Sequence, residues 1–228
     1  MCPWSILPPA VIDFCESNRC AWVVEPINSL SCLAFVLGGI YIWHLSKRDG
    51  AKGMLKATGP ISAFIGVFSV ALHATMTQFG QFLDLASMYL FGTILLFFNY
   101  RRMRTALKGP AHEKHDIILY LGANAFIWLL HALWPASGVP AFGIMVTTTF
   151  ILEIILWRIQ RRKVQYRWLW ATVALFGVSM AIWIADIRLW WCNPTSWLQG
   201  HALWHCGCAA STVTAYKHFR QFARYGEV

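Results

Sequence analysis

Four ionisable residues lie inside apolar segments of this chain, where charged and polar side chains are rare. His73 lies near the end of one such segment, Asp84 near the start of the next, and His201 and His205 near the start of the last. An ionisable side chain within a segment of membrane length is costly and usually serves a function. The four-residue spacing of His201 and His205 places both imidazoles on one face of a helix, one turn apart. This spacing favours the binding of one metal ion by both side chains.

His73 can supply a third ligand to the same ion. Three neutral imidazoles with an open fourth position are typical of catalytic zinc, which lowers the pKa of a bound water to roughly 7. Asp84 would then be available as a base. The competing interpretation, that each histidine only hydrogen-bonds a neighbouring helix, is weakened by three histidines and an aspartate at one depth. His131 reaches a similar depth and is the alternative ligand, although a packing role fits it better.

The composition excludes a soluble domain. Hydrophobic residues make up 57% of the 228 residues and charged residues 13%, with a mean hydropathy of +0.50, whereas soluble domains are roughly a quarter charged. Apolar stretches close to the length of about 20 residues that spans a bilayer cover residues 23–46, 58–77, 82–100, 116–134, 139–157, 168–186 and 197–215. The sequence therefore predicts an all-α bundle of seven transmembrane helices.

Basic residues indicate the orientation of this bundle. Most of the 19 lysines and arginines lie in the breaks after the first, third and fifth apolar stretches and in the C-terminal tail. By the positive-inside rule these parts face the cytosol, so we expect the N-terminus in the lumen or periplasm and the C-terminus in the cytosol. The predicted organisation is an outer segment at 1–22, a membrane domain at 23–215 and a basic tail at 216–228. The net charge of +9 is spread over these loops, which favours contact with anionic lipid and not nucleic acid.

Five short segments of the chain resemble motifs of one family. They are DFCESN at 13–18, EPINSLS at 25–31, SVALH at 69–73 with Asp84 eleven residues after the histidine, DIRLWWC at 186–192 and HALWH at 201–205. Their order and spacing resemble the alkaline ceramidases, which belong to a superfamily of seven-transmembrane metal-dependent hydrolases (CREST) that also includes progestin and adiponectin receptors. Two departures are Phe14 in place of a tryptophan and LASM in place of E-L-P-M at 85–88.

The resemblance implies two metal sites and a reaction. It implies catalytic zinc bound by His73, His201 and His205, with Ser69 beside the ion and Asp84 as acid and base. It also implies calcium bound by acidic and amide side chains and one carbonyl oxygen, which suit this ion; these ligands are Asp13, Glu16, Asn18, Glu25 and the carbonyl of Phe14. Without the resemblance, a solvated acidic segment is the simpler interpretation of residues 13–25.

A disulfide bond between Cys15 and Cys192 is also expected. Cys2, Cys15, Cys20 and Cys192 all fall on the predicted outer side, where disulfides persist. The resemblance singles out Cys15 and Cys192, and Cys20 is the main competitor of Cys15 for Cys192.

The implied function is a zinc-dependent intramembrane hydrolase that cleaves the amide bond of ceramide-like lipids into a fatty acid and a sphingoid base. One alternative is a lipid receptor or another lipid hydrolase of the same superfamily. An alternative of another class is a bis-histidine haem electron carrier, although only His44 lies in a span near the inner side. The expected partner is a membrane lipid. The sequence leaves open the oligomeric state and whether the membrane is a bacterial inner membrane or that of the ER, Golgi or plasma membrane.

Other ionisable residues receive simpler interpretations. Glu153 is expected to point towards the cytosolic interface, and His218 receives no role because it falls beyond the last apolar stretch. Asp186 is expected to pair with Arg188 or to cap the loop that follows it.

Overall fold

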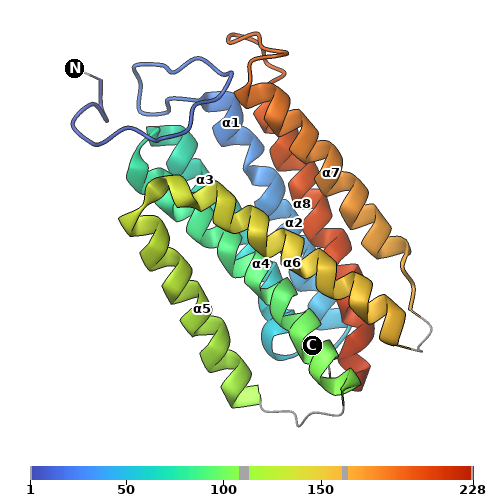
Figure 1. Cartoon of the computed structure of the whole chain (residues 1–228). Coiled ribbons are helices and arrows are strands. Elements are labelled where there is room, and N and C mark those ends of the chain that lie inside the picture. The colour runs from blue at the N-terminus through green and yellow to red at the C-terminus, as the bar shows by residue number, and fades with distance from the viewer. Residues whose placement is uncertain (1, 108–112, 161–163, 227) are drawn as a thin grey trace.

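The structure, a computed structural model, describes residues 2–107, 113–160, 164–226 and 228 (Figure 1). Its elements are α1 (Pro26–Ser31), α2 (Leu33–Arg48), α3 (Gly53–Thr75), α4 (Gln78–Ala106), α5 (Glu113–Leu133), the 3₁₀ turn η1 (Pro135–Ser137), α6 (Gly138–Ile159), α7 (Arg167–Ile187), α8 (Gly200–Phe219) and the 3₁₀ segment η2 (Arg220–Tyr225). No β-strand occurs in these described residues. The predicted all-α fold is therefore confirmed.

The long helices run side by side as one bundle (Figure 1). The segment before α1 covers one end of the bundle, which we call the N-terminal end, and the chain finishes towards the opposite or far end (Figure 1). Each of the seven predicted apolar stretches falls largely within one long helical rod, with α1 and α2 together forming the first. Several basic residues used to predict the orientation, at 108, 161, 162 and 163, lie outside the described residues.

Six helices in the described part of the chain are long and apolar enough to cross a membrane: α1 with α2, α3, α4, α5, α6 and α7. These helices are consistent with a multi-pass membrane protein. Helix α8 is less apolar because it carries polar side chains such as His205, Ser211 and Thr212, and these are buried among the other helices. It can therefore lie in the bundle without exposing these groups to lipid. The count of seven spans stays a prediction.

Glycines allow α2 and α3 to approach each other closely. A Cβ atom on Gly39 would lie 2.5 Å from the backbone nitrogen of Ala63, and one on Gly66 would lie 2.6 Å from the carbonyl oxygen of Cys32. Small residues permit such contacts between membrane helices. The close packing holds α3 against the junction of α1 and α2, where Cys32 separates the two helices.

The segment before α1 lacks regular structure but is fixed to the N-terminal end of the bundle. The backbone N–H of Ala10 donates to the carbonyl of Met76 at 2.9 Å, and that of Glu25 donates to the carbonyl of His73 at 2.9 Å. Phe14 and Val24 pack against Leu72 and Met76 in a small buried cluster. These contacts tie the segment to the end of α3.

Two disulfide bonds fasten the same region. Cys15 and Cys192, the pair expected from the sequence, are bonded with Cα atoms 5.5 Å apart. Cys2 and Cys20 form a second disulfide that the sequence analysis did not assign. The first bond joins the N-terminal segment to the loop between α7 and α8.

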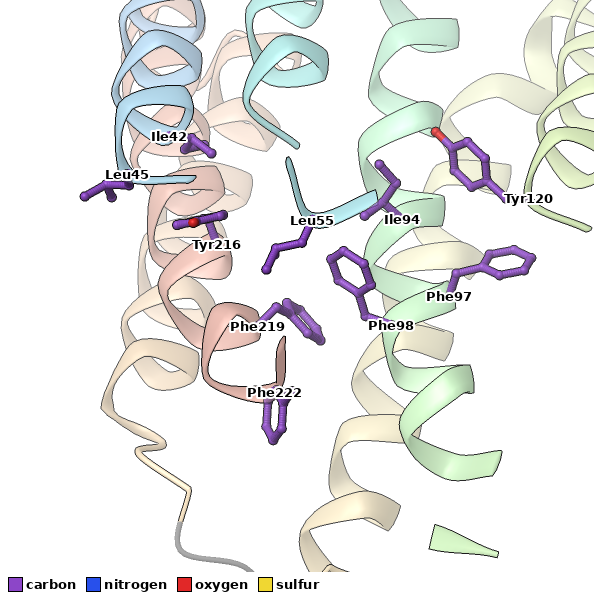
Figure 2. Close-up of a cluster of buried hydrophobic side chains, with 10 residues drawn as sticks. All are labelled: Ile42, Leu45, Leu55, Ile94, Phe97, Phe98, Tyr120, Tyr216, Phe219 and Phe222. Atoms are coloured by element: carbon purple, nitrogen blue, oxygen red, sulfur yellow. The ribbon is translucent and has the colours of Figure 1, made fainter. Parts of the chain in front are cut away.

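The largest hydrophobic cluster lies nearer the far end of the bundle. Figure 2 shows its members on several helices: Ile42, Leu45, Leu55, Ile94, Phe97, Phe98, Tyr120, Tyr216, Phe219 and Phe222. The cluster unites α2, α3, α4, α5, α8 and η2. This cluster packs the far half of the bundle together.

Candidate active site

Three buried histidines meet at the N-terminal end of the bundle. His73 lies in the last turn of α3, and His201 and His205 lie in the first two turns of α8. Their ring centroids are 4.8 Å apart for His73 and His201, 5.0 Å for His73 and His205, and 4.5 Å for His201 and His205. The structure therefore brings together all three residues expected to bind zinc.

The geometry of His73 and His201 fits two ligands of one metal ion. The Nε2 atoms of His73 and His201 lie 3.2 Å apart, and two nitrogen ligands of a tetrahedral zinc, each at about 2.0–2.1 Å from the ion, are about 3.3 Å apart. The opposite ring nitrogens are fixed from outside: His73 Nδ1 lies 2.6 Å from Glu25 Oε2, and His205 Nδ1 lies 2.7 Å from Ser31 Oγ. A carboxylate or hydroxyl at this position orients a ligating imidazole. Glu25 and Ser31 thus bind the Nδ1 atoms of His73 and His205, which leaves the Nε2 atoms of these two rings facing the cluster.

Cys32 offers an additional donor that the sequence analysis missed. One ligand atom from each of Cys32, His73 and His205 lies within 4.8 Å of the others, and all three residues are buried. Cys32 Sγ is 3.7 Å from His205 Nδ1 and donates to the carbonyl of Asn28 at 3.1 Å. These donors are compatible with a metal but do not identify zinc. No pattern in the sequence indicated this role, because only the fold brings Cys32 near His205.

His131, the alternative ligand considered from the sequence, has a different environment. Its ring stacks on Phe82 with centroids 5.7 Å apart and meets the edge of Tyr89 at 6.2 Å. Its ring atoms also lie against Gly138, where a Cβ atom would be only 2.7 Å away. No contact with the three clustered histidines occurs among the described residues. His131 therefore packs between helices.

Ser69 and Asp84 lie beside the histidines. Ser69 is one turn before His73 on α3, and its Oγ is 3.4 Å from His205 Nε2. The carboxyl group of Asp84 on α4 lies near the Ser69 hydroxyl. Ser69, Asp84, His201 and His205 all line one cavity. Two of the three expected ligands, the expected base Asp84 and Ser69 therefore face a common space.

A second, almost entirely apolar cavity adjoins the first. Phe35, Ile65, Met88 and Phe142 line both cavities. The second cavity continues towards the far end between α4, α6, α7 and α8, and its walls include Phe91, Leu95, Val146, Phe150, Leu169 and Phe176. Helix α6 packs on α4 and α7 packs along α8, so the cavity lies between these two pairs. Together the cavities combine a polar end and a long apolar body.

Asp186 positions the start of α8. Its Oδ1 accepts a hydrogen bond from the backbone N–H of His201 at 3.1 Å, and its Oδ2 accepts one from the backbone N–H of Cys15 at 3.1 Å. No ion pair with Arg188 occurs among the described residues. A carboxylate at a helix N-terminus satisfies free N–H groups and interacts favourably with the helix dipole. Asp186 therefore holds the first turn of α8 and the N-terminal segment together.

The residues expected to bind calcium lie next to the histidines. Glu16 and Glu25 are buried, whereas Asp13 and Asn18 are exposed. Glu16 accepts hydrogen bonds from the backbone N–H groups of Ile27 and Asn28 at 2.9 and 2.8 Å, which caps α1. Asp13 Oδ1 accepts a bond of 3.4 Å from Asn18 Nδ2. A fully solvated acidic segment is thus wrong for Glu16 and Glu25.

The charge balance of this segment is unfavourable without a cation. Glu25 is fully buried, and the carboxyl groups of Asp13 and Asp186 lie near enough to repel a negative charge on it. Burial raises the pKa of Glu16 above its ordinary value. Among the described residues, Glu25 Oε1 and Asn28 Oδ1 are buried without hydrogen-bond partners. Two free oxygen acceptors beside crowded carboxyl groups are suited to a hard cation.

Phe14 connects this acidic segment to the histidines. Its ring centroid lies 3.9 Å from that of His201 and 5.0 Å from that of His73. The expectation from sequence concerned only its carbonyl oxygen. The side chain adds a direct packing contact between the two groups of candidate ligands.

Comparison with known proteins identifies the family of the chain. The family described as Ceramidase matches residues 8–226, which is essentially the whole chain. A search of curated proteins finds no match. The matched region includes every residue of the candidate site described above. The chain therefore belongs to the ceramidase family.

Proposed function

We propose that this protein is a zinc-dependent hydrolase that cleaves the amide bond of ceramide-type lipids within the membrane. The family supports a hydrolase acting on ceramide amide bonds. The observation that carries the proposal is the common cavity lined by Ser69, Asp84, His201 and His205 and its apolar continuation. A polar reaction centre joined to a long apolar cavity fits a lipid whose amide lies at the boundary of head group and acyl chain.

His73, His201 and His205 would hold the metal, which when bound would polarise the amide carbonyl and lower the pKa of a water molecule. Asp84 accepts the proton of the water as its oxygen bonds to the carbonyl carbon, and donates it to the amine nitrogen as the C–N bond breaks. Ser69 donates a hydrogen bond to the carbonyl oxygen as negative charge develops there. The products are a fatty acid and a sphingoid base.

Seven spans with the N-terminus outside are the second part of the proposal. Both disulfides lie at the N-terminal end of the bundle, and disulfides persist in oxidising compartments outside the cytosol. The histidines lie at the same end. The reaction would therefore take place near the outer surface of the membrane, with the amide at the mouth of the bundle and the acyl chain within it.

A haem carrier fits the structure less well. The Nε2 atoms of His73 and His201 are 3.2 Å apart, so a haem plane does not fit between them as it would between axial ligands.

A receptor of the same superfamily would differ from the proposed hydrolase because it would not cleave the lipid. Purified protein in lipid nanodiscs should release fatty acid from ceramide but not from a phosphatidylcholine of the same acyl chain. Release from neither lipid would contradict the hydrolase, and release from phosphatidylcholine alone would contradict the amide substrate.

We also propose that calcium binds beside the zinc site, at Asp13, Glu16, Asn18, Glu25 and the carbonyl of Phe14. The support is the buried pair of acidic residues and the free oxygens of Glu25 and Asn28. The ion would fasten the N-terminal segment to α1 and, through Glu25, to His73.

Calcium should therefore stabilise the folded protein. Chelation is expected to lower the melting temperature and millimolar calcium to restore it, because a ligand that binds only the folded state stabilises by mass action, by about 2.7 kcal/mol at 100 times its Kd. Asp13→Asn should blunt this response without loss of zinc, whereas Asp49→Asn at the far end should leave it unchanged. An identical melting curve with chelator and with calcium would contradict the calcium site.

A further inference from the structure

A buried ionic network lies at the far end of the apolar cavity. The Arg102 side chain on α4 is fully buried. Its Nη1 donates to Asn99 Oδ1 at 2.8 Å and to the carboxylate of Glu153 on α6, and its Nη2 donates to Gln160 Oε1 at 2.9 Å. The guanidinium lies 3.7 Å from the ring centroid of Phe222. Arg102 is thus held in one position from several sides.

Glu153 joins Arg102 to His218. Its other oxygen, Oε1, lies 3.0 Å from Nε2 of His218 on α8, and both residues are buried. Glu153 was expected from the sequence to point towards the cytosolic interface, but the structure buries it between helices. His218 was expected to have no chemical role, and its hydrogen bond to a neighbouring helix agrees with that expectation. Glu153 is the common partner of Arg102 and His218, and the three residues lie on three different helices, which periodicity within one segment does not reveal. We call Arg102, Glu153 and His218 the ionic network.

The ionic network forms the inner boundary of the apolar cavity. Asn99, Glu153 and His218 line the cavity at this end, whereas most other walls are aliphatic or aromatic. Buried charges are tolerated only while they stay paired and hydrogen-bonded. A hydrocarbon chain offers no such partner, so it cannot advance past these groups without separating them.

The combined length of the two adjoining cavities corresponds to the length of an extended lipid chain. Asp84 and Asn99 lie on the same helix, and a rise of about 1.5 Å per residue places them about 22 Å apart along its axis. A carbon–carbon bond of about 1.5 Å advances an extended chain by about 1.25 Å per carbon. The two adjoining cavities together therefore have the length of a chain of about 16 to 18 carbons.

We propose that the ionic network is the floor of the acyl cavity and sets the longest hydrocarbon chain that the protein accommodates. The identity of the whole lipid rests on the proposed function, but the chain limit requires only that one hydrocarbon chain occupies the cavity. A network that merely pins α4, α6 and α8 together would not affect which chain length binds best. The chain-length profile therefore separates the two roles.

Binding of free fatty acids tests the floor without requiring catalysis. Saturated fatty acids of 10 to 24 carbons would compete with radiolabelled palmitic acid for the full chain in nanodiscs. Affinity should rise with length to about 16 to 18 carbons, as more apolar area is buried, and then fall at least several-fold. A continued rise to 24 carbons would overturn the proposal.

Filling the cavity above the floor should shorten the preferred chain. Val146 lines the cavity two turns before Glu153 on α6, and Thr149 lines it one turn before Glu153. Val146→Phe should shift the optimum to shorter chains by more carbons than Thr149→Phe does. Ile151→Phe is the matched control, because Ile151 on the same helix is 52% exposed, and it should keep the wild-type optimum. An unchanged optimum in a folded Val146→Phe protein would overturn the proposal.

Removing the charges tests the network itself. The double substitution Arg102→Met with Glu153→Met leaves no unpaired carboxylate or guanidinium and retains flexible apolar bulk. The folded variant should bind chains longer than the wild-type limit, whereas an unchanged limit would overturn the proposal. If this variant does not fold, the chain-length optima of Val146→Phe and Thr149→Phe still test the proposal. Chain-selective binding without ceramide cleavage would support the proposed floor and contradict the proposed hydrolase. Ceramide cleavage without a limit on chain length would support the hydrolase and contradict the floor.

Discussion

Substitution of Asp84 by asparagine should reduce ceramide hydrolysis by about 10³-fold, within the range of 10² to 10⁴ that a general acid or base contributes. The amide preserves the shape of the side chain but cannot take a proton from water. Asp84 lies near Ser69 and lines the cavity beside His201 and His205. Zinc content should remain at the wild-type level because Asp84 is not among the three proposed ligands. The measurement is kcat on ceramide together with elemental analysis of the same preparation.

The matched control for this variant is Asp49→Asn. Asp49 accepts hydrogen bonds from Tyr216 and Arg220 at the far end of the bundle, so its loss should leave the rate on ceramide near that of the wild type. Undiminished turnover in Asp84→Asn would remove this residue from the mechanism. Ser69→Ala should lower the rate by about 10²–10³-fold, which is the usual cost of a single oxyanion donor.

Alanine at His73, His201 or His205 should lower the zinc content from about one ion per chain to nearly none. A tight site needs all three nitrogen donors, because binding depends on ligand count and on geometry fixed in advance by the fold. The two helices α3 and α8 supply that geometry, and Glu25 and Ser31 orient two of the rings. Elemental analysis of each purified variant is the measurement.

Two control variants decide between the donor sets. His131→Ala removes a buried imidazole outside the cluster and should retain zinc. Cys32→Ser should also retain zinc if the three histidines are the ligands. Loss of zinc in Cys32→Ser with retention in His201→Ala would instead assign the ion to Cys32, His73 and His205.

The residues of the candidate site could be predicted from the sequence because their arrangement follows from helix periodicity and from their depth in the membrane. His201 and His205 share a helix face at a spacing of four residues, and the alternation of spans places His73 and Asp84 at the same end of the bundle. The structure brings these residues together. Helix type and approximate bounds were also predictable, since long apolar stretches in a membrane chain leave few alternatives to helices.

Features that depend on contacts between distant segments were not predictable in this way. Cys32 is an ordinary small residue in an apolar helix until the α1–α2 junction brings it near His205. The Cys2–Cys20 bond was one of several pairings open to the outer cysteines. The burial of Glu153 requires Arg102, whose position on another helix follows only from the packing of α4 against α6.

Release of isotopically labelled fatty acid from ceramide in H₂¹⁸O is the most direct test of the account. Purified wild-type protein loaded with zinc should release fatty acid that carries one ¹⁸O atom in its carboxyl group, together with an equal amount of sphingoid base. Protein stripped of metal should release neither product until zinc is returned. Mass spectrometry that detects no labelled fatty acid from the zinc-loaded protein, or equal release from the stripped protein, would contradict a metal-dependent hydrolase at the three-histidine site.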